Sequence, residues 1–208
     1  MSYRGYLPFM VNLCTKRYIK TKEPISILEI GIQHGITTLS LATHLSIRGV
    51  DYQFDAVDIK LFDYVPLLAD SLLIGTRERL NLIEQNSLVY LDQLRNKKFD
   101  LVLVDGDHNY YTVSQECELL KKFTDENTVF IFDDYDGKWS HKDLFYKRDR
   151  EGYEDVKLAT EPPVGEQNKQ GVKSAVDEFI EESGMQKVKL MQGSPIVVAS
   201  SHIISGGF

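Results

Sequence analysis

The stretch Phe99-Asp100-Leu101-Val102-Leu103-Val104-Asp105-Gly106-Asp107-His108-Asn109-Tyr110 predicts the fold of this chain. Its apolar half is typical of a short strand that is buried on both faces of a parallel sheet. Its polar half carries two carboxylates and an imidazole, on Asp105, Asp107 and His108. Open α/β sheets bind their ligands at the carboxyl ends of the strands. We therefore expect a binding or catalytic site where this strand ends.

Strand-like and helix-like segments alternate on both sides of this stretch. We expect further strands at residues 25–30, 52–59, 80–87 and 128–134, and helices at residues 36–47, 64–74, 87–95, 111–123 and 172–182. This alternation is typical of βαβ units with right-handed crossovers in a parallel sheet. Two further strands, at residues 187–192 and 195–200, depart from it because a hairpin turn at residues 192–194 joins them.

Two segments flank or interrupt the pattern. Residues 1–24 predict an N-terminal helix or arm, and residues 25–208 one domain. Residues 135–170 are polar and highly charged, and they include Trp139 and His141. Because a loop of this length in a compact domain is usually functional or disordered, we expect a lid or substrate-binding insertion here.

Composition excludes some classes of partner. A chain of 208 residues suits one sizeable α/β domain, and a net charge of −7 disfavours nucleic acid or an anionic membrane as the partner. No apolar run approaches the ~20 residues of a membrane span, and we expect no targeting segment. Cys14 and Cys117 match no metal-ligand spacing, so we expect reduced thiols in a cytoplasmic protein.

The loop after the first strand predicts a cofactor site. Gly31 and Gly35 flank a tight turn that leads directly into a helix, where backbone N–H groups approach a ligand closely. A dinucleotide fingerprint requires glycine at the positions of Gln33 and Ile36, so NAD and FAD are disfavoured. A cofactor without a pyrophosphate suits this wider loop. The alternative is a turn that only packs the helix on the sheet.

Two polar residues extend the expected cofactor site. Asp58 ends the second strand, where a carboxylate can accept hydrogen bonds from ribose hydroxyls. Its alternative role is that of a surface acid or helix cap. Ser87, after the third strand, is expected near the edge of an adenine, or else as a helix N-cap.

Three carboxylates predict a metal site. Asp105 follows the fourth strand, and Asp133 and Asp134 follow the fifth. At adjacent strand ends they repel one another unless a cation or a proton intervenes, and an all-oxygen ligand set suits Mg²⁺ rather than zinc. His108 is the candidate general base and His141 the alternative. The opposing interpretations are an acid pair that initiates a turn and a helix-capping His108.

Five motifs resemble those of class I S-adenosylmethionine-dependent methyltransferases. They are L-E-I-G-I-Q-H-G-I-T-T (28–38), A-V-D-I (56–59), F-D-L-V-L-V-D-G-D-H-N-Y (99–110), V-F-I-F-D-D-Y (129–135) and G-V-K-S-A-V-D-E-F-I (171–180). The pattern D-G-D-H-x-Y followed by D-D is similar to the branch of macrolide-sugar O-methyltransferases and cephalosporin-hydroxylase-like proteins. The resemblance implies a Rossmann-like α/β fold with a seven-stranded, mostly parallel sheet, an antiparallel last strand and helices on both faces.

The resemblance also implies roles for single residues. It places S-adenosylmethionine along Gly31, Gly35, Asp58, Ser87 and Asp105, with Glu29 near its amino-acid end. It makes Asp105, Asp133 and Asp134 the ligands of a divalent metal and His108 the base, and it leaves Asp107 without a role.

The activity implied by the resemblance is metal-assisted O-methylation of a small hydroxylated acceptor, a sugar or a catechol-like compound. The sequence does not determine the oligomeric state, although a helical N-terminal arm could pair two subunits in a homodimer. Three alternatives stay open, because a fold does not determine a function. They are a metal-independent methyltransferase that acts on nitrogen or on a protein, a non-catalytic cofactor-binding module, and a hydroxylase-like or other metal enzyme.

Overall fold

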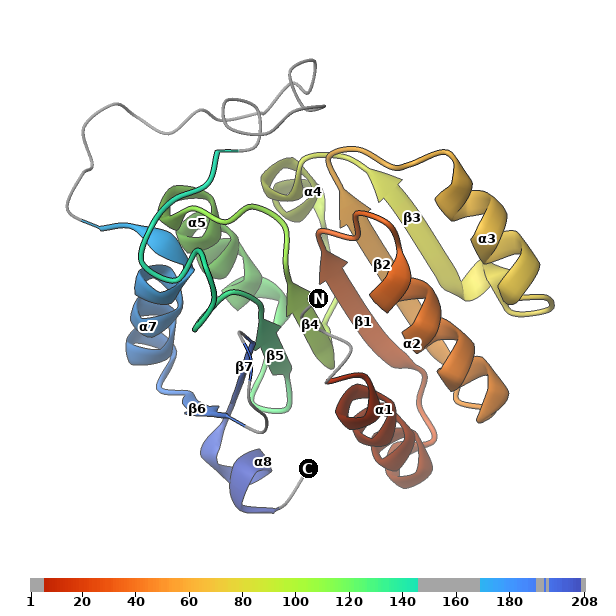
Figure 1. Ribbon diagram of the computed structural model, residues 1–208. Helices are drawn as coiled ribbons and strands as arrows, with labels where there is room; N and C mark the ends of the chain where they lie inside the picture. Colours follow the sequence, from red (N-terminus) through yellow and green to blue (C-terminus); the bar gives the residue numbers. More distant parts are fainter. Residues whose placement is uncertain (1–5, 146–168, 190–192, 194, 207–208) are drawn as a thin grey trace.

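A computed structural model describes residues 6–145, 169–189, 193 and 195–206, and its centre is a seven-stranded sheet (Figure 1). The strands are β1 (Ile25–Ile30), β2 (Tyr52–Asp58), β3 (Leu80–Glu84), β4 (Leu101–Val104), β5 (Val129–Phe132), β6 (Gln186–Val188) and β7 (Ile196–Ala199). Their order across the sheet is β3-β2-β1-β4-β5-β7-β6. β7 pairs antiparallel with β5 and β6, whereas the other pairings are parallel, which confirms the predicted sheet.

Helices cover both faces of the sheet (Figure 1). The helices are α1 (Leu7–Thr21), α2 (Ile36–Ile47), α3 (Tyr64–Leu72), α4 (Ser87–Gln93), α5 (Tyr110–Leu120), α7 (Gly171–Ser183) and α8 (Ser201–Ser205), with 3₁₀ turns η2 (Arg77–Arg79) and η3 (Lys121–Phe123). Successive strand residues point to opposite faces. Ile27 therefore packs in the core under α1, α2 and α3, and Leu28 in the core under α4, α5 and α7. The result is a three-layer α/β/α fold.

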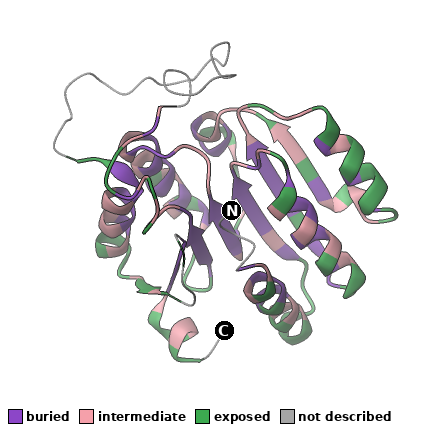
Figure 2. Ribbon diagram, viewed as in Figure 1, coloured by how far each residue is buried: buried purple, intermediate pink, exposed green. Residues whose placement is uncertain are grey.

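The central strands explain why the opening stretch reads as continuously apolar. Every residue of β4 and of β5 is buried, as Figure 2 shows in purple. Leu101 and Leu103 contribute to one core, and Val102 and Val104 to the other. A strand with helices on both faces has no solvent-facing side, so its sequence does not alternate.

Some element boundaries differ from the sequence-based expectation by a few residues. β3 ends at Glu84 because the Asn86 side chain accepts hydrogen bonds from the N–H groups of Leu88 and Val89 and so begins α4. Asn86, and not Ser87, is therefore the N-cap. The predicted strand at residues 187–192 is described only as Gln186–Val188. The predicted hairpin turn falls largely on residues 192 and 194, which lie outside the described residues.

The described part of the predicted insertion is fixed to the rest of the domain. The N–H of Val172, at the start of α7, donates to the carbonyl of Trp139 at 3.1 Å. Tyr135 is buried, and its hydroxyl donates to Asp177 at 2.6 Å. Tyr135 is thus a core residue and not part of an open loop. Residues 146–168, the rest of the insertion, lie outside the described residues.

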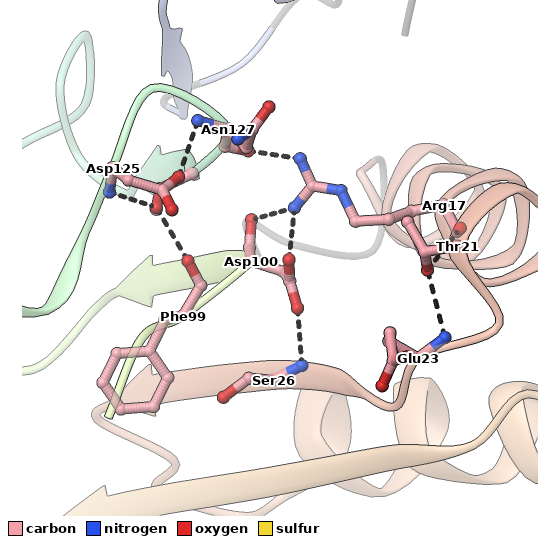
Figure 3. A network of polar contacts seen from close by, with 9 residues as sticks. Arg17, Thr21, Glu23, Ser26, Phe99, Asp100, Asp125 and Asn127 are labelled. Atoms are coloured by element: carbon pink, nitrogen blue, oxygen red, sulfur yellow. Dashed lines mark hydrogen bonds and ion pairs between the residues drawn. The ribbon is translucent and has the colours of Figure 1, made fainter. Parts of the chain in front are cut away.

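A polar network attaches α1 to the amino ends of the central strands (Figure 3). Arg17 donates to the carbonyl and carboxylate oxygens of Asp100, at 3.1 and 2.8 Å, and to the carbonyl of Asn127. The other carboxylate oxygen of Asp100 accepts from the N–H of Ser26 at 2.8 Å. This network lies at the edge of the sheet opposite the carboxyl ends, so α1 is anchored away from the predicted site.

Candidate active site

The glycine loop and the acidic end of β4 are in direct contact. The N–H of Asp105 donates to the carbonyl of Ile30 at 2.8 Å. Gly31 has a φ of +85°, and a Cβ added there would lie 2.1 Å from the carbonyl oxygen of Asp105. Only glycine permits this approach, because it has no Cβ and tolerates positive φ. The predicted cofactor loop and the acidic end of β4 therefore meet at Gly31.

His108 and the predicted metal ligands form one cluster. The Nε2 atom of His108 lies 3.3 Å from Oδ1 of Asp105 and 3.2 Å from Oδ2 of Asp134. Asp105, His108 and Asp133 each offer a ligand atom, and these atoms lie within 4.8 Å of one another. The structure thus brings together Asp105, His108, Asp133 and Asp134. His108 lies beside the acids and also offers a nitrogen atom that could bind a metal.

The backbone positions each member of this cluster. The N–H of Asp133 donates to the carbonyl of Val104 at 3.0 Å, which continues the β4–β5 pairing one residue beyond the strands. Asp134 follows with a φ of +52°, so the chain turns sharply after Asp133. The carbonyl of His108 accepts from the N–H of Leu144 at 3.0 Å. Three separate segments therefore meet at the carboxyl ends of β4 and β5.

Burial and mutual contact shift the pKa values of the residues in this cluster. Burial raises the pKa of Asp105 to about 7; the hydrogen bond to His108 opposes this rise, and the charge of Asp133 adds to it. Burial by itself lowers the pKa of His108, but the hydrogen bond to Asp105 and the three carboxylate charges raise it above its usual value. Burial also raises the pKa of Asp134. The imidazolium form of His108 thus supplies the positive charge that crowded carboxylates require.

Asp107 has a structural role that the sequence did not reveal. Its Oδ1 accepts from the N–H of His108 at 3.0 Å, and its Oδ2 accepts from the hydroxyl of Thr112 at 2.8 Å. Asn109 caps the same helix, α5, by accepting from the N–H of Thr112 at 2.8 Å. Asp107 therefore holds the turn that presents His108.

Asp58 is bonded to the glycine loop. Its Oδ2 accepts from the N–H groups of Ile32 and Gln33, each at 2.8 Å, and its Oδ1 accepts from the N–H of Lys60 at 3.1 Å. A carboxylate offers about four lone-pair positions. Asp58 thus shapes the loop and retains acceptor capacity for one ribose hydroxyl.

Gly35 and Glu29 complete the predicted cofactor loop. Gly35 is the N-cap residue of α2 with a φ of +71°, and a Cβ there would lie 2.9 Å from a methyl group of Val65. Glu29 is buried at the end of β1 and accepts from the hydroxyl of Thr38 at 2.6 Å. Burial raises the pKa of Glu29 to about 8. Glu29 therefore lies beneath the loop, on the α2 side of the sheet.

Ser87 contacts a buried acid, Glu116, which none of the sequence motifs indicated. Its hydroxyl donates to Oε1 of Glu116, at 2.5 Å, and Glu116 is 0% exposed. A sequence signal for Glu116 existed. Glu116 lies on the face of α5 that also carries Val113, Cys117 and Leu120. Helical spacing predicts an apolar residue at this position, so a glutamate there is the signal.

The alternative base lies in a different environment. His141 is exposed, whereas His108 is 7% exposed and contacts two carboxylates. Trp139, nearby in sequence, is half-buried, with the ammonium groups of Lys138 and Lys142 within 4.5 and 5.0 Å of its ring centroid. The geometry thus favours His108 over His141 as the base.

Comparisons with known proteins agree with the fold. A family model described as a methyltransferase domain matches residues 28–135, which is more than half of the chain. A search of curated proteins found no match. Within the described residues, the structure contains no helix that is both long and apolar enough to cross a membrane.

Solved structures with a similar fold include several methyltransferases. The chain is similar to an O-methyltransferase from Bacillus cereus in complex with SAH, with 17% identity, a TM-score of 0.53, and coverage of 94% of this chain and 81% of that one. It is similar to CalS11, a TDP-rhamnose 3′-O-methyltransferase of calicheamicin biosynthesis, with 13% identity, a TM-score of 0.63, and coverage of 95% and 80%. It is also similar to SAH-bound PaMTH1 from Podospora anserina, with 15% identity, a TM-score of 0.57, and coverage of 97% and 80%. These likenesses confirm the predicted fold.

Proposed function

We propose that this chain, which belongs to the methyltransferase family whose model it matches, is an O-methyltransferase of small molecules. It transfers a methyl group from S-adenosylmethionine to a hydroxyl of a small acceptor. The observation that carries this proposal is the contact between Gly31 and the backbone of Asp105. It makes the cofactor loop and the acid cluster neighbours. A methyl donor on the loop and a hydroxyl at the cluster would then lie within reach of each other, and proximity of this kind supplies much of the rate of a bimolecular transfer.

S-adenosylmethionine fits the residues that line the loop. Asp58 retains acceptor capacity for a ribose hydroxyl, and the loop at residues 31–35 lacks the glycine spacing that a pyrophosphate requires. Glu29 lies below the loop, near the proposed position of the methionine end. When bound, the cofactor supplies an electrophilic methyl group. The chain's own groups hold it in place and set its direction.

Thermal unfolding with two ligands tests the choice of cofactor. A ligand that binds only the folded state raises the midpoint temperature by mass action. We expect S-adenosylhomocysteine (SAH), the demethylated product, to raise it and NAD to leave it unchanged at the same concentration. A larger shift with NAD would overturn the proposal.

A divalent cation fits the acid cluster. Asp105, Asp133 and Asp134 would hold it through oxygen atoms, the ligands that Mg²⁺ prefers. When bound, such a cation would lower the pKa of an acceptor hydroxyl. His108 is within 3.3 Å of two of these carboxylates and, once it is no longer the counter-charge of the acids, its Nε2 can accept the hydroxyl proton.

Two variants separate the roles of His108 and the acids. We expect calorimetry to show Mg²⁺ binding that Asp134→Ala abolishes and His108→Ala preserves. We expect methyl transfer to fall by about 10²–10⁴-fold in His108→Ala, the usual contribution of a general base, and to change little in the control His141→Ala. Mg²⁺ binding unchanged in Asp134→Ala would refute the metal assignment, and Mg²⁺ binding lost in His108→Ala would make His108 a ligand rather than the base.

An activity assay would identify the class of acceptor. SAH release is measured against a panel of sugars, nucleotide-linked sugars and catechols, with and without Mg²⁺. Nucleotide-linked sugars are included because CalS11 is named for TDP-rhamnose. Turnover of any hydroxylated acceptor that needs Mg²⁺ would support the proposal. Turnover of an amine or a protein without Mg²⁺ would favour a metal-independent enzyme, and SAH binding without any turnover a binding module. The predicted homodimer stays a prediction, which sedimentation would test.

A further inference from the structure

Glu116 carries a buried carboxyl that is only half satisfied. It lies in the middle of α5 and is 0% exposed. Its Oε1 accepts from the hydroxyl of Ser87, whereas its Oε2 has no hydrogen-bond partner among the described residues. Buried polar groups are nearly always paired, and an unpaired one costs free energy. A stable protein therefore needs a reason to keep an acid at this position.

The bond to Ser87 connects this acid to the edge of the sheet where the cofactor is proposed to bind. Ser87 is half-buried and is the first residue of α4, three residues after β3 ends. The bond to Glu116 therefore spans from the core to the carboxyl edge. No residue of the acid cluster takes part in this hydrogen bond, although the charge of His108 acts on Glu116.

The direction of this hydrogen bond determines what Ser87 can offer a ligand. A serine hydroxyl has one proton and two lone pairs. When the proton is directed to Glu116, the oxygen of Ser87 can only accept. A hydroxyl without such a partner rotates freely and can donate or accept.

We propose that Ser87 and Glu116 form a specificity element for a hydrogen-bond donor on the cofactor's base, namely the exocyclic amino group of adenine. Ser87 makes the contact, and Glu116 is a positioning residue that directs the serine proton inward. This inference rests on the proposed function, because it takes S-adenosylmethionine as the cofactor. A purine that lacks the amino group would leave the serine oxygen without its partner.

Ionisation of Glu116 fixes the hydrogen-bond direction under alkaline conditions. Burial raises the pKa of Glu116 to about 8; the bond from Ser87 opposes this rise, the charge of Asp107 adds to it, and that of His108 opposes it. At pH 9, above this pKa, most molecules carry Glu116 as a carboxylate, which can only accept. Binding measured at pH 9 therefore reports on one hydrogen-bond direction.

Calorimetry at pH 9 with two ligands tests the inference. One ligand is SAH, and the other is its analogue with hydrogen in place of the 6-amino group. We expect the wild-type protein to prefer SAH about tenfold, the usual worth of one good hydrogen bond. The control Glu118→Gln, on the same helix but exposed and paired with Lys121, should keep this preference.

Variants of the pair then separate contact from positioning. In Ser87→Ala the preference should fall to about onefold, because the accepting oxygen is gone. In Glu116→Met, an apolar residue of similar length, it should fall to about threefold, because the serine hydroxyl is no longer directed. The double variant should equal Ser87→Ala, since Glu116 acts only through Ser87. The double variant also removes both polar groups, so the test survives if Ser87→Ala alone does not fold.

The outcomes distinguish this inference from the proposed function. Wild-type protein that binds neither ligand would refute the proposed cofactor. Wild-type protein that binds both equally, or a Ser87→Ala variant that keeps the tenfold preference, would refute only the specificity element. A Glu116→Met variant with unchanged preference would show that the buried acid does not position Ser87.

Discussion

Substitution of Gly31 by alanine tests whether the contact between the cofactor loop and β4 holds the site together. Two costs arise, and the structure separates them. An alanine at a φ of +85° is strained in the left-handed region, at about 1–2 kcal/mol. Its Cβ would also lie 2.1 Å from the carbonyl oxygen of Asp105, a backbone atom that cannot rotate away. Forcing an extra methyl group into a packed region costs about 1–3 kcal/mol more.

Gly75→Ala is the matched control, because Gly75 shares the strain but not the clash. Gly75 has a φ of +77°, and among the described residues other than its chain neighbours no atom lies within 4 Å of the position its Cβ would take. We expect Gly75→Ala to lower the free energy of unfolding by about 1–2 kcal/mol and Gly31→Ala by about 2–5 kcal/mol. In a chain of this size, each kcal/mol lowers the melting temperature by about 2–4 °C.

Urea unfolding followed by circular dichroism gives both free energies, and calorimetry with SAH gives the effect on binding. SAH affinity should fall in Gly31→Ala, because the loop must move away from Asp105, and should stay at the wild-type value in Gly75→Ala. If Gly31→Ala unfolds at the same urea concentration as Gly75→Ala, the close approach does not exist and the argument for adjacent donor and acceptor sites fails.

Three further predictions concern other parts of the domain. The folded state holds the proton of Glu29 up to a pKa of about 8, against 4.5 in the unfolded chain. The free energy of unfolding of the wild type should therefore fall between about pH 4.5 and 8 relative to Glu29→Gln, by up to about 1.4 kcal/mol per pH unit. Urea unfolding across this range checks it, and a difference between the two proteins that does not change with pH would contradict it. Arg17→Met should lower the free energy of unfolding by about 1–3 kcal/mol, because it removes the Arg17 donor from one carboxylate oxygen and two carbonyls of the α1 network. Denaturant unfolding that matches the wild type would contradict this. Cys14 and Cys117 are free thiols in the core, and burial raises the pKa of both, that of Cys14 to about 12. Neither thiol should therefore react with iodoacetamide until urea unfolds the chain, and labelling of the folded protein, detected by mass spectrometry, would contradict this.

The sequence predicted the elements of the fold well because these depend on local pattern. The apolar run that ends at Val104 needs no distant information to indicate a buried strand, and the structure buries every residue of it. The acids that follow β4 and β5 were placed together because parallel strands end at the same edge of a sheet. The cluster of Asp105, His108 and Asp133 therefore follows from strand order alone, once the sheet is accepted.

Side-chain partners were predicted less well, because they join segments that are far apart in sequence. Asp58 was expected to face a ligand, yet three backbone N–H groups take most of its acceptor capacity. Tyr135 was expected on a lid, yet its ring is buried and its hydroxyl reaches α7. Asp107 was left without a role, and its two hydrogen bonds shape the turn before α5.

The sequence by itself therefore determined the α/β fold and the edge of the sheet at which the acids, the imidazole of His108 and the glycine loop lie. Periodicity and strand ends are properties of neighbouring residues, so they can be read along the chain. Only the tertiary structure decided that Gly31 touches the backbone of Asp105 and that Ser87 gives its proton to Glu116. Such contacts depend on how β1, β4, α4 and α5 pack in three dimensions, and the spacing of residues along one chain does not contain that information.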